Sequence, residues 1–245
     1  MDMLRYSRTI AVPGIGEEGQ QRLCDASVLV VGAGALGSVV ALYLAGAGVG
    51  HIGLADFDTI DISNLQRQIA YAEDQAGERK VAALAARLRA LNTTISVTEH
   101  PVLVTARNAA TLFADYSHIA DCTDNPSTKH LMAALAQQCG KPCVTAGVSG
   151  FTAQVFTTLP GAPSYNDMFG EPDRSNPAGC PAFAPCGADG VVGPAAGVAA
   201  TCQCTELIKL ITGAGEPLSH PEATPPTASL FTIDLRTFAT ATLTI

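Results

Sequence analysis

The chain has 245 residues, of which 47% are hydrophobic and 15% are charged, and its formal net charge is -8. This length and apolar content are enough for one large domain with a substantial core. An acidic chain without a cluster of Lys and Arg lacks the charge to bind nucleic acid or an anionic membrane, so neither is an expected partner.

The N-terminal segment MDMLRYSRTI carries charges and has no continuous apolar stretch, so we expect no signal peptide. No stretch reaches the roughly 18–20 apolar residues that a membrane span needs. We therefore expect a cytoplasmic protein whose eight cysteines are reduced thiols.

The first half of the chain alternates short β-branched runs with longer helical patterns, which is typical of βαβ units and a parallel sheet. Strands are expected at 28–31, 51–56, 94–100 and 118–123, and helices at about 35–46, 77–91, 108–113 and 126–139. Between the second strand and the next helix, the polar segment DFDTIDISNLQRQ has no clean period. We interpret it as a functional loop with a short helical turn.

The second half begins with two apolar runs, PCVTAGV and GFTAQVFTTL, whose short Ser/Gly link indicates an antiparallel pair. A Gly- and Pro-rich loop follows at about 160–190, and loops of this length are usually functional or mobile. A helix at 194–211 and strands at 229–234 and 238–245 complete the chain. The pattern predicts one α/β domain over 1–245, a Rossmann-like doubly wound sheet that is parallel in 1–150 and antiparallel in 151–245.

The first strand runs directly into Gly32-Ala33-Gly34-Ala35-Leu36-Gly37 and then into a helix, which is the G-x-G-x-x-G pattern of nucleotide-binding turns. Gly32 permits the tight turn, Gly34 lets a phosphate approach the backbone, and Gly37 lets the helix pack against the strand. The helix N-terminus offers unpaired N–H groups to an anion. Asp56 ends the second strand, where a carboxylate can bind ribose hydroxyls.

Cations and carboxylates follow the glycine turn in a pattern that favours phosphoryl or nucleotidyl transfer over hydride transfer. Arg67 and Lys80 can stabilise charge on the phosphates, and Asn64 lies in the same loop. Asp124 follows the fourth strand, at the edge of the sheet where ligands bind, and can position Mg²⁺. An NAD-dependent oxidoreductase is the alternative, but the histidines occupy positions that favour structural roles: His51, His100, His118, His130 and His220.

Five segments carry a resemblance to a known family: YSRTI, VVGAGALGS, LADFDTIDISNLQRQ, the helix that starts near Lys80, and DCTDN. Together they resemble the ThiF/MoeB/HesA family, the bacterial relatives of ubiquitin-activating enzymes. The segment from Gly190 to Gly213 is similar to the helix after the family's crossover loop, with most likeness to the ThiF branch.

The resemblance implies an enzyme that uses ATP and Mg²⁺ to adenylate the C-terminal Gly-Gly carboxylate of a ubiquitin-like sulfur carrier. It implies that Asp56 binds the ribose, that Asn64, Arg67 and Lys80 contact phosphates, and that Asp124 positions Mg²⁺. It also implies a homodimer, in which Arg8 reaches into the partner subunit's site.

Relatives in this family usually hold a structural zinc with two C-x-x-C pairs. Ser164 and Asp167 stand where the first pair belongs, and the second pair is missing, so we expect no zinc. Cys186 occupies the place of the family's loop cysteine, which implies a role in sulfur transfer, and Cys180 lies in the same loop.

The expected carrier is a ThiS-like protein of thiamine thiazole synthesis. A MoaD-like carrier of the molybdopterin pathway, or a carrier or peptide of another sulfur pathway, is the alternative. A non-catalytic scaffold that binds the carrier is a further alternative, although Arg8, Arg67, Lys80 and Asp124 are all present.

Overall fold

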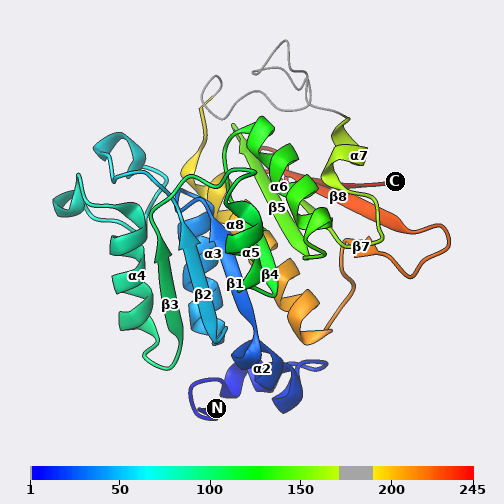
Figure 1. Ribbon diagram of the computed structural model, residues 1–245, viewed down its shortest axis with the longest axis horizontal. Coiled ribbons are helices and arrows are strands. Elements are labelled where there is room, and N and C mark those ends of the chain that lie inside the picture. The colour runs from blue at the N-terminus through cyan, green and yellow to red at the C-terminus, as the bar shows by residue number, and fades with distance from the viewer. Residues whose placement is uncertain (1, 171–189) are drawn as a thin grey trace.

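A mixed sheet forms the centre of the protein, and a computed structural model describes residues 2–170 and 190–245 (Figure 1). Within the described residues, the strand order is β3-β2-β1-β4-β5-β6-β8-β7, and β9 pairs with β8. The strands are β1 (Ser27–Val31), β2 (His51–Ala55), β3 (Ser96–His100), β4 (His118–Asp121), β5 (Cys143–Ser149), β6 (Thr152–Thr158), β7 (Ser219–His220), β8 (Thr227–Asp234) and β9 (Ala239–Thr244).

Helices cover both faces of this sheet. On one face α3, α4 and α8 pack into the main hydrophobic core, and on the other α5 and α6 form a second core with β1 and β4. None of the described helices is both long and apolar enough to cross a membrane. The helices are α1 (Ser7–Ile10), α2 (Gly16–Asp25), α3 (Gly37–Ala47), α4 (Lys80–Leu91), α5 (Ala109–Ala114), α6 (Pro126–Gln138), α7 (Tyr165–Phe169) and α8 (Gly193–Thr212), with 3-10 turns η1 (Ile62–Asn64) and η2 (Glu73–Gln75).

Strand β1 shows why the first half folds as a parallel sheet. Val28 and Val30 enter the main core, whereas Leu29 and Val31 enter the second one. A strand that is buried on both faces needs a continuous apolar run, which is the pattern of parallel sheets. Strands β1 to β5 pair in parallel and β5 pairs antiparallel with β6, so the predicted doubly wound α/β fold is confirmed.

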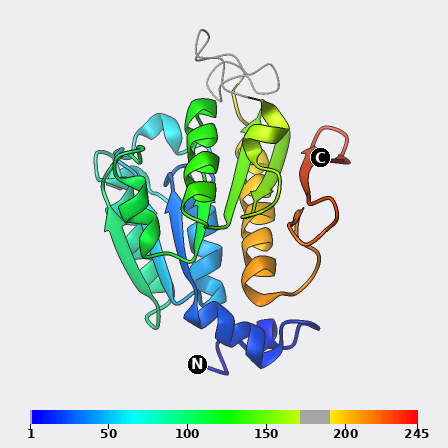
Figure 2. The same cartoon turned by 45° about the vertical axis from the view of Figure 1, so that its right-hand side comes forward.

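The N-terminal helices α1 and α2 were not predicted from the sequence. The α2 segment GEEGQQRLCD is mostly polar, and its buried residues are Gly19, Gln20 and Leu23. Tyr6 fixes this segment, because its hydroxyl accepts a hydrogen bond from Asn92 Nδ2 at 2.8 Å. Figures 1 and 2 show the N-terminus at one end of the molecule, opposite the end where β4 leads into α6.

The segment 160–190 was predicted to be a loop, but its described part includes a short helix. Its first part contains the helix α7, which is five residues long and therefore too short to show a helical period. The described part of the second half also contains β7, a two-residue strand that pairs with β8 and was not predicted. The helix expected at 194–211 is present as α8.

The close packing of α3 against β1 yields a stability prediction. A Cβ at Gly37 would overlap the carbonyl oxygen of Gly32, which belongs to the backbone and cannot turn away. We expect Gly37→Ala to lower the free energy of unfolding by about 1–3 kcal/mol or more, because the helix must shift.

Gly46 provides the matched control for this substitution on the same helix. Nothing lies within 4 Å of a Cβ at Gly46, so Gly46→Ala should raise the free energy of unfolding by up to about 1 kcal/mol. Urea denaturation of both variants measures the contrast. Equal effects of the two substitutions would contradict the packing argument.

Candidate functional site

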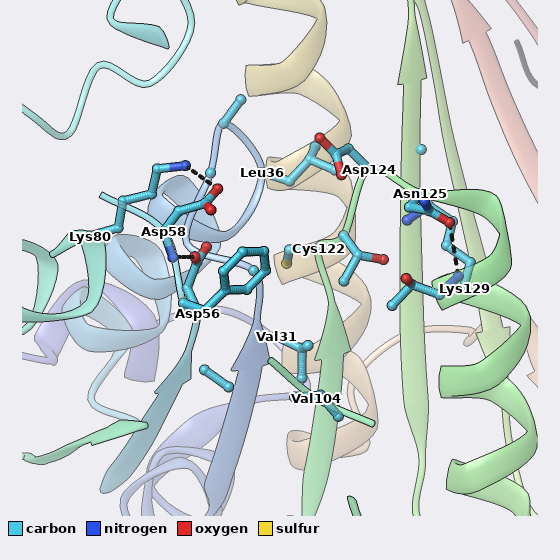
Figure 3. A pocket seen from close by; sticks show the side chains of 18 of the residues that line it. Val31, Leu36, Asp56, Asp58, Lys80, Val104, Cys122, Asp124, Asn125 and Lys129 are labelled. Carbon is cyan, nitrogen blue, oxygen red and sulfur yellow. Dashed lines mark hydrogen bonds and ion pairs between the residues drawn. The ribbon is translucent and has the colours of Figure 1, made fainter. Parts of the chain in front are cut away.

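A pocket of about 410 Å³ opens at the carboxyl ends of β1, β2 and β4 (Figure 3). Its walls come from the glycine turn, the loop after β2, the start of α4 and the β4–α6 connection. Ligands of open α/β sheets bind at this edge, and the volume lies within the range of small-molecule sites. It is therefore the candidate functional site of the described part of the chain.

The glycine turn forms the floor of the pocket. Gly32 has a φ of +91°, a conformation that favours glycine, and a Cβ there would lie 2.9 Å from the carbonyl oxygen of Cys122. Gly34 lines the pocket with its backbone, whereas Gly37 is buried under the turn. The turn thus leaves the N-terminus of α3 facing the pocket, where an anion is stabilised.

Asp56 connects the turn with the loop after β2. Its carboxylate accepts hydrogen bonds from the backbone N–H of Ala33 at 2.6 Å and from that of Asp58 at 2.7 Å. Tyr71 donates its hydroxyl to the carbonyl oxygen of Ala33 at 2.6 Å. Burial, with a smaller effect of the nearby Asp56 charge, raises the pKa of Tyr71 far above its usual value, so its hydroxyl stays protonated as a donor.

Lys80 reaches the pocket from the first residue of α4. Its side chain is nearly buried, and Nζ lies 3.0 Å from Oδ2 of Asp58, whose side chain is about half exposed. Arg67 also lines the pocket, and its guanidinium donates to the carbonyl oxygen of Ser63 at 3.4 Å. Two of the predicted phosphate-binding cations therefore line the pocket.

Two other predicted site residues lie elsewhere. Asn64 is in η1, where its carbonyl oxygen accepts hydrogen bonds from the N–H groups of Arg67 and Gln68, and its residue is not among those that line the pocket. Arg8 is exposed on α1, and the N-terminal helices lie at the opposite end of the molecule from the end where β4 leads into α6 (Figure 1). A role of Arg8 in this pocket would need a second subunit.

Asp124 lies in the β4–α6 connection, across the pocket from Asp58 and Lys80 (Figure 3). Its residue is exposed, and its carboxylate makes no hydrogen bond or ion pair with any other described residue. Mg²⁺ is commonly held by one or two protein carboxylates together with substrate phosphates and water. Asp124 fits this mode of binding, although the described residues contain no cluster of three or more potential ligands.

Lys129 and Asp121 were not predicted from the sequence as site residues; Lys129 lines the pocket, and Asp121 is buried behind it. Lys129 lines the pocket although it is only 5% exposed, and Nζ is 3.8 Å from Oδ2 of the fully buried Asp121. The signal that could have found Lys129 is its place on the predicted helix after DCTDN, one turn beyond Asn125.

Of the eight cysteines, three are half-buried: Cys24, Cys139 and Cys202. Cys180 and Cys186 lie outside the described residues. Cys122, Cys143 and Cys204 are buried, and burial raises the pKa of each thiol, that of Cys204 to about 12. These three thiols therefore stay protonated near neutral pH, including Cys122 at the wall of the pocket.

Ser164 and Asp167, which stand where the family has its first cysteine pair, bind each other at the start of α7. The Ser164 hydroxyl and its backbone N–H both donate to Oδ2 of Asp167 at 2.7 Å. In return, Ser164 Oγ accepts a hydrogen bond from the N–H of Asp167 at 3.4 Å. This arrangement is a capping box, which satisfies backbone donors at a helix start.

With this geometry in view, the sequence matches the ThiF family over residues 6–245. The chain belongs to this family. The adenylyltransferase and sulfurtransferase uba4 of Emericella nidulans is 41% identical over 236 residues, which cover 93% of the chain and 47% of uba4. The probable adenylyltransferase/sulfurtransferase MoeZ of Mycobacterium tuberculosis is 40% identical over 223 residues, which cover 89% of the chain and 55% of MoeZ. The chain spans about half the length of these curated relatives.

Solved structures of MccB share the fold of this chain. The Escherichia coli protein MccB crystallised with ATP superposes with a TM-score of 0.77 at 23% identity, over 98% of the chain and 70% of MccB. A second MccB structure gives a TM-score of 0.78 at 22% identity, over 99% of the chain and 72% of MccB. At this identity the likeness establishes the architecture and nothing more specific.

The capping box predicts a pH-dependent contribution to stability. Hydrogen bonds from the backbone and side chain of Ser164 lower the pKa of Asp167 below its usual value. A carboxylate with a lowered folded-state pKa stabilises the fold above its unfolded pKa of about 4, and this stabilisation is lost as the pH falls through the folded value. We expect Ser164→Ala to cost about 1 kcal/mol at pH 7 and less near pH 3.

Urea denaturation at the two pH values measures this effect. Ser127→Ala is the control, because Ser127 is exposed in the first turn of α6 and forms no hydrogen bond through its side chain with another described residue. A loss in Ser164→Ala that is the same at both pH values would rule out the contribution of Asp167.

Proposed function

We propose that the protein is an ATP-dependent adenylyltransferase that activates the C-terminal Gly-Gly carboxylate of a ubiquitin-like sulfur carrier. The observation that carries the proposal is the composition of the pocket, where an anion-binding turn, Arg67, Lys80 and Asp124 face one another. Membership of the ThiF family supports adenylyl transfer over the NAD-dependent alternative. The carboxylate of Asp124, which has no partner among the described residues, and the cations of the pocket also favour an enzyme over a passive scaffold.

In this proposal each group acts by position and charge. The backbone N–H groups from Gly32 to Gly37 receive the phosphates, and Asp56 accepts hydrogen bonds from the ribose. Arg67 and Lys80 stabilise negative charge that develops on the α-phosphate and the departing pyrophosphate, and Asn64 supports the same loop. Mg²⁺, held by Asp124 and the phosphates, would neutralise phosphate charge when bound.

The adenylation step needs no protein nucleophile. A carboxylate oxygen of the carrier attacks the α-phosphorus, and the bond from this phosphorus to the bridging oxygen of pyrophosphate breaks. The electron pair of that bond leaves with pyrophosphate, and the products are an acyl adenylate and pyrophosphate. A role of Cys186 in the later transfer of sulfur stays a prediction from the sequence.

The names of the relatives bear on which kind of carrier the protein activates. The names of the curated relatives uba4 and MoeZ combine adenylyl transfer with sulfur transfer, and neither name mentions thiamine. This favours the alternative in the sequence argument, a MoaD-like carrier or a carrier of another sulfur pathway, over a ThiS-like carrier. Exchange assays with both kinds of carrier distinguish these possibilities.

Asp124 provides the sharpest test of the proposed chemistry. We expect Asp124→Ala to lower carrier-dependent ATP–pyrophosphate exchange by about 100-fold or more, because it removes a charge that positions the phosphates. The free energy of unfolding should change by less than about 0.5 kcal/mol, since the residue is exposed. Asp74→Ala is the control, because Asp74 is exposed and does not line the pocket. Unchanged exchange in Asp124→Ala would refute the assignment.

A homodimer with Arg8 acting across the interface is part of the proposal, because the N-terminal helices lie at the end of the molecule opposite the β4–α6 connection (Figure 1). Arg8→Ala and Asp124→Ala homodimers should both be inactive. A heterodimer of the two variants, purified through different affinity tags, contains one intact site if Arg8 acts in trans. We expect about half of the wild-type exchange rate per dimer. An inactive heterodimer would show that Arg8 does not act across an interface.

A further inference from the structure

Lys129 is a buried cation that lines the pocket, and the proposed function assigns it no role. It lies in the first turn of α6, and Nζ donates to the carbonyl oxygen of Ala146 on β5 at 2.6 Å. The side chain is 7% exposed, yet it lines the pocket on the wall opposite Lys80 (Figure 3). An ordinary solvated lysine would extend into water, so this one is held in place by the fold.

Asp121 forms an ion pair with Lys129 but accepts no hydrogen bond from the ammonium group of that lysine. Oδ1 of Asp121 accepts hydrogen bonds from the N–H and the hydroxyl of Thr123, at 3.1 and 2.7 Å. Oδ2 faces Lys129 Nζ at 3.8 Å, which is an ion pair but too long for a hydrogen bond. Among the described residues, Nζ therefore has one hydrogen-bond acceptor, the oxygen of Ala146, whereas an ammonium group has three donors.

A second cavity adjoins Lys129 on the side away from the glycine turn. Its volume is about 10 Å³, and Gln154 and Thr145 contribute to its lining. This is space for roughly one water molecule. An anion that reaches the remaining donors of Lys129 must therefore come from the main pocket, which Lys129 and Asp124 both line.

The geometry of nucleotidyl transfer indicates which anion would reach Lys129 from the main pocket. Phosphoryl and nucleotidyl transfer place the attacking and leaving oxygens roughly in line through the phosphorus. Lys80 lies across the pocket from Lys129 (Figure 3), and Arg67 also lines the pocket, so these two cations can hold the departing pyrophosphate. The attacking group then approaches from the opposite wall, which carries Lys129.

We infer that Lys129 binds the carboxylate of the acceptor and brings it to the α-phosphate from the β4–α6 side of the pocket. This inference rests on the proposed function. Both reactants are anions, so a cation beside the attacking carboxylate lowers their mutual repulsion. Lys129 keeps its proton throughout, because the carboxylate attacks as an anion and the pyrophosphate leaves with the electron pair of the broken bond.

The test compares carriers that end in a Gly-Gly carboxylate or in the matching carboxamide. MoaD-like and ThiS-like carriers are first tested for ATP–pyrophosphate exchange with the wild-type enzyme. The carrier that supports exchange is then titrated by calorimetry in both forms, with a non-hydrolysable ATP analogue present. We expect the wild type to bind the carboxylate form about 10- to 100-fold more tightly, which is the usual effect of a hydrogen bond to a charged group.

The variant that tests Lys129 is the double substitution Asp121→Asn with Lys129→Met, because Lys129→Met alone leaves a buried, unpaired carboxylate. We expect it to bind both carrier forms equally and to bind the ATP analogue as the wild type does. In exchange assays its KM for the carrier should rise by the same factor, with an unchanged KM for ATP. Lys129→Arg keeps the cation and its partner Asp121, and should keep the discrimination.

The outcomes separate the two proposals. Exchange by the wild type together with full discrimination in the double variant would overturn the role of Lys129 and leave the proposed function intact. Weakened binding of the ATP analogue by the double variant would place Lys129 at the nucleotide and also overturn the inference. No exchange by the wild type with either carrier would overturn the proposed function and, with it, the acceptor site.

Discussion

The approach of α3 to the end of β1 is the constraint on which the site depends. Because position 37 has no side chain, the helix can start directly over the carbonyl oxygen of Gly32. This brings the N-terminus of α3 to the carboxyl edge of the sheet, where the loops after β2 and β4 also emerge. An anion-binding helix end and two charged walls thus meet at one place.

The second constraint is the balance of charge around the pocket. Lys80 is paired with Asp58, and Lys129 is paired with Asp121. An unpaired buried charge would be strongly destabilising, so each low-exposure cation needs a carboxylate while the pocket holds no ligand. The pairs differ in a way that matters for binding. Asp58 is about half exposed and hydrogen-bonded to Lys80, whereas Asp121 is fully buried and holds Lys129 at a longer distance.

Much of the fold and part of the site follow from local sequence patterns. The run VLVV predicts a strand that is buried on both faces, and the glycine turn predicts a helix start beside it. The short elements α1, α7 and β7 could not be predicted in this way, because they have no period and depend on tertiary partners. Tyr6, for example, is fixed by Asn92, a residue 86 positions away in the sequence. The capping box of Ser164 and Asp167 is also a local sequence pattern, but these residues were considered only as replacements for zinc-binding cysteines.

The motif DCTDN shows why the sequence alone identified only one of its two aspartates as a site residue. It contains two aspartates three residues apart, and both are acceptable ligands for a metal or a cation. Strand β4 ends at the first of them, so Asp121 remains inside the sheet and Thr123 satisfies one of its oxygens. Asp124 follows after the chain has left the strand and is exposed to the pocket. One motif therefore supplies a buried carboxylate that positions a lysine and an exposed carboxylate that is free for a ligand, and only the end of the strand distinguishes the two.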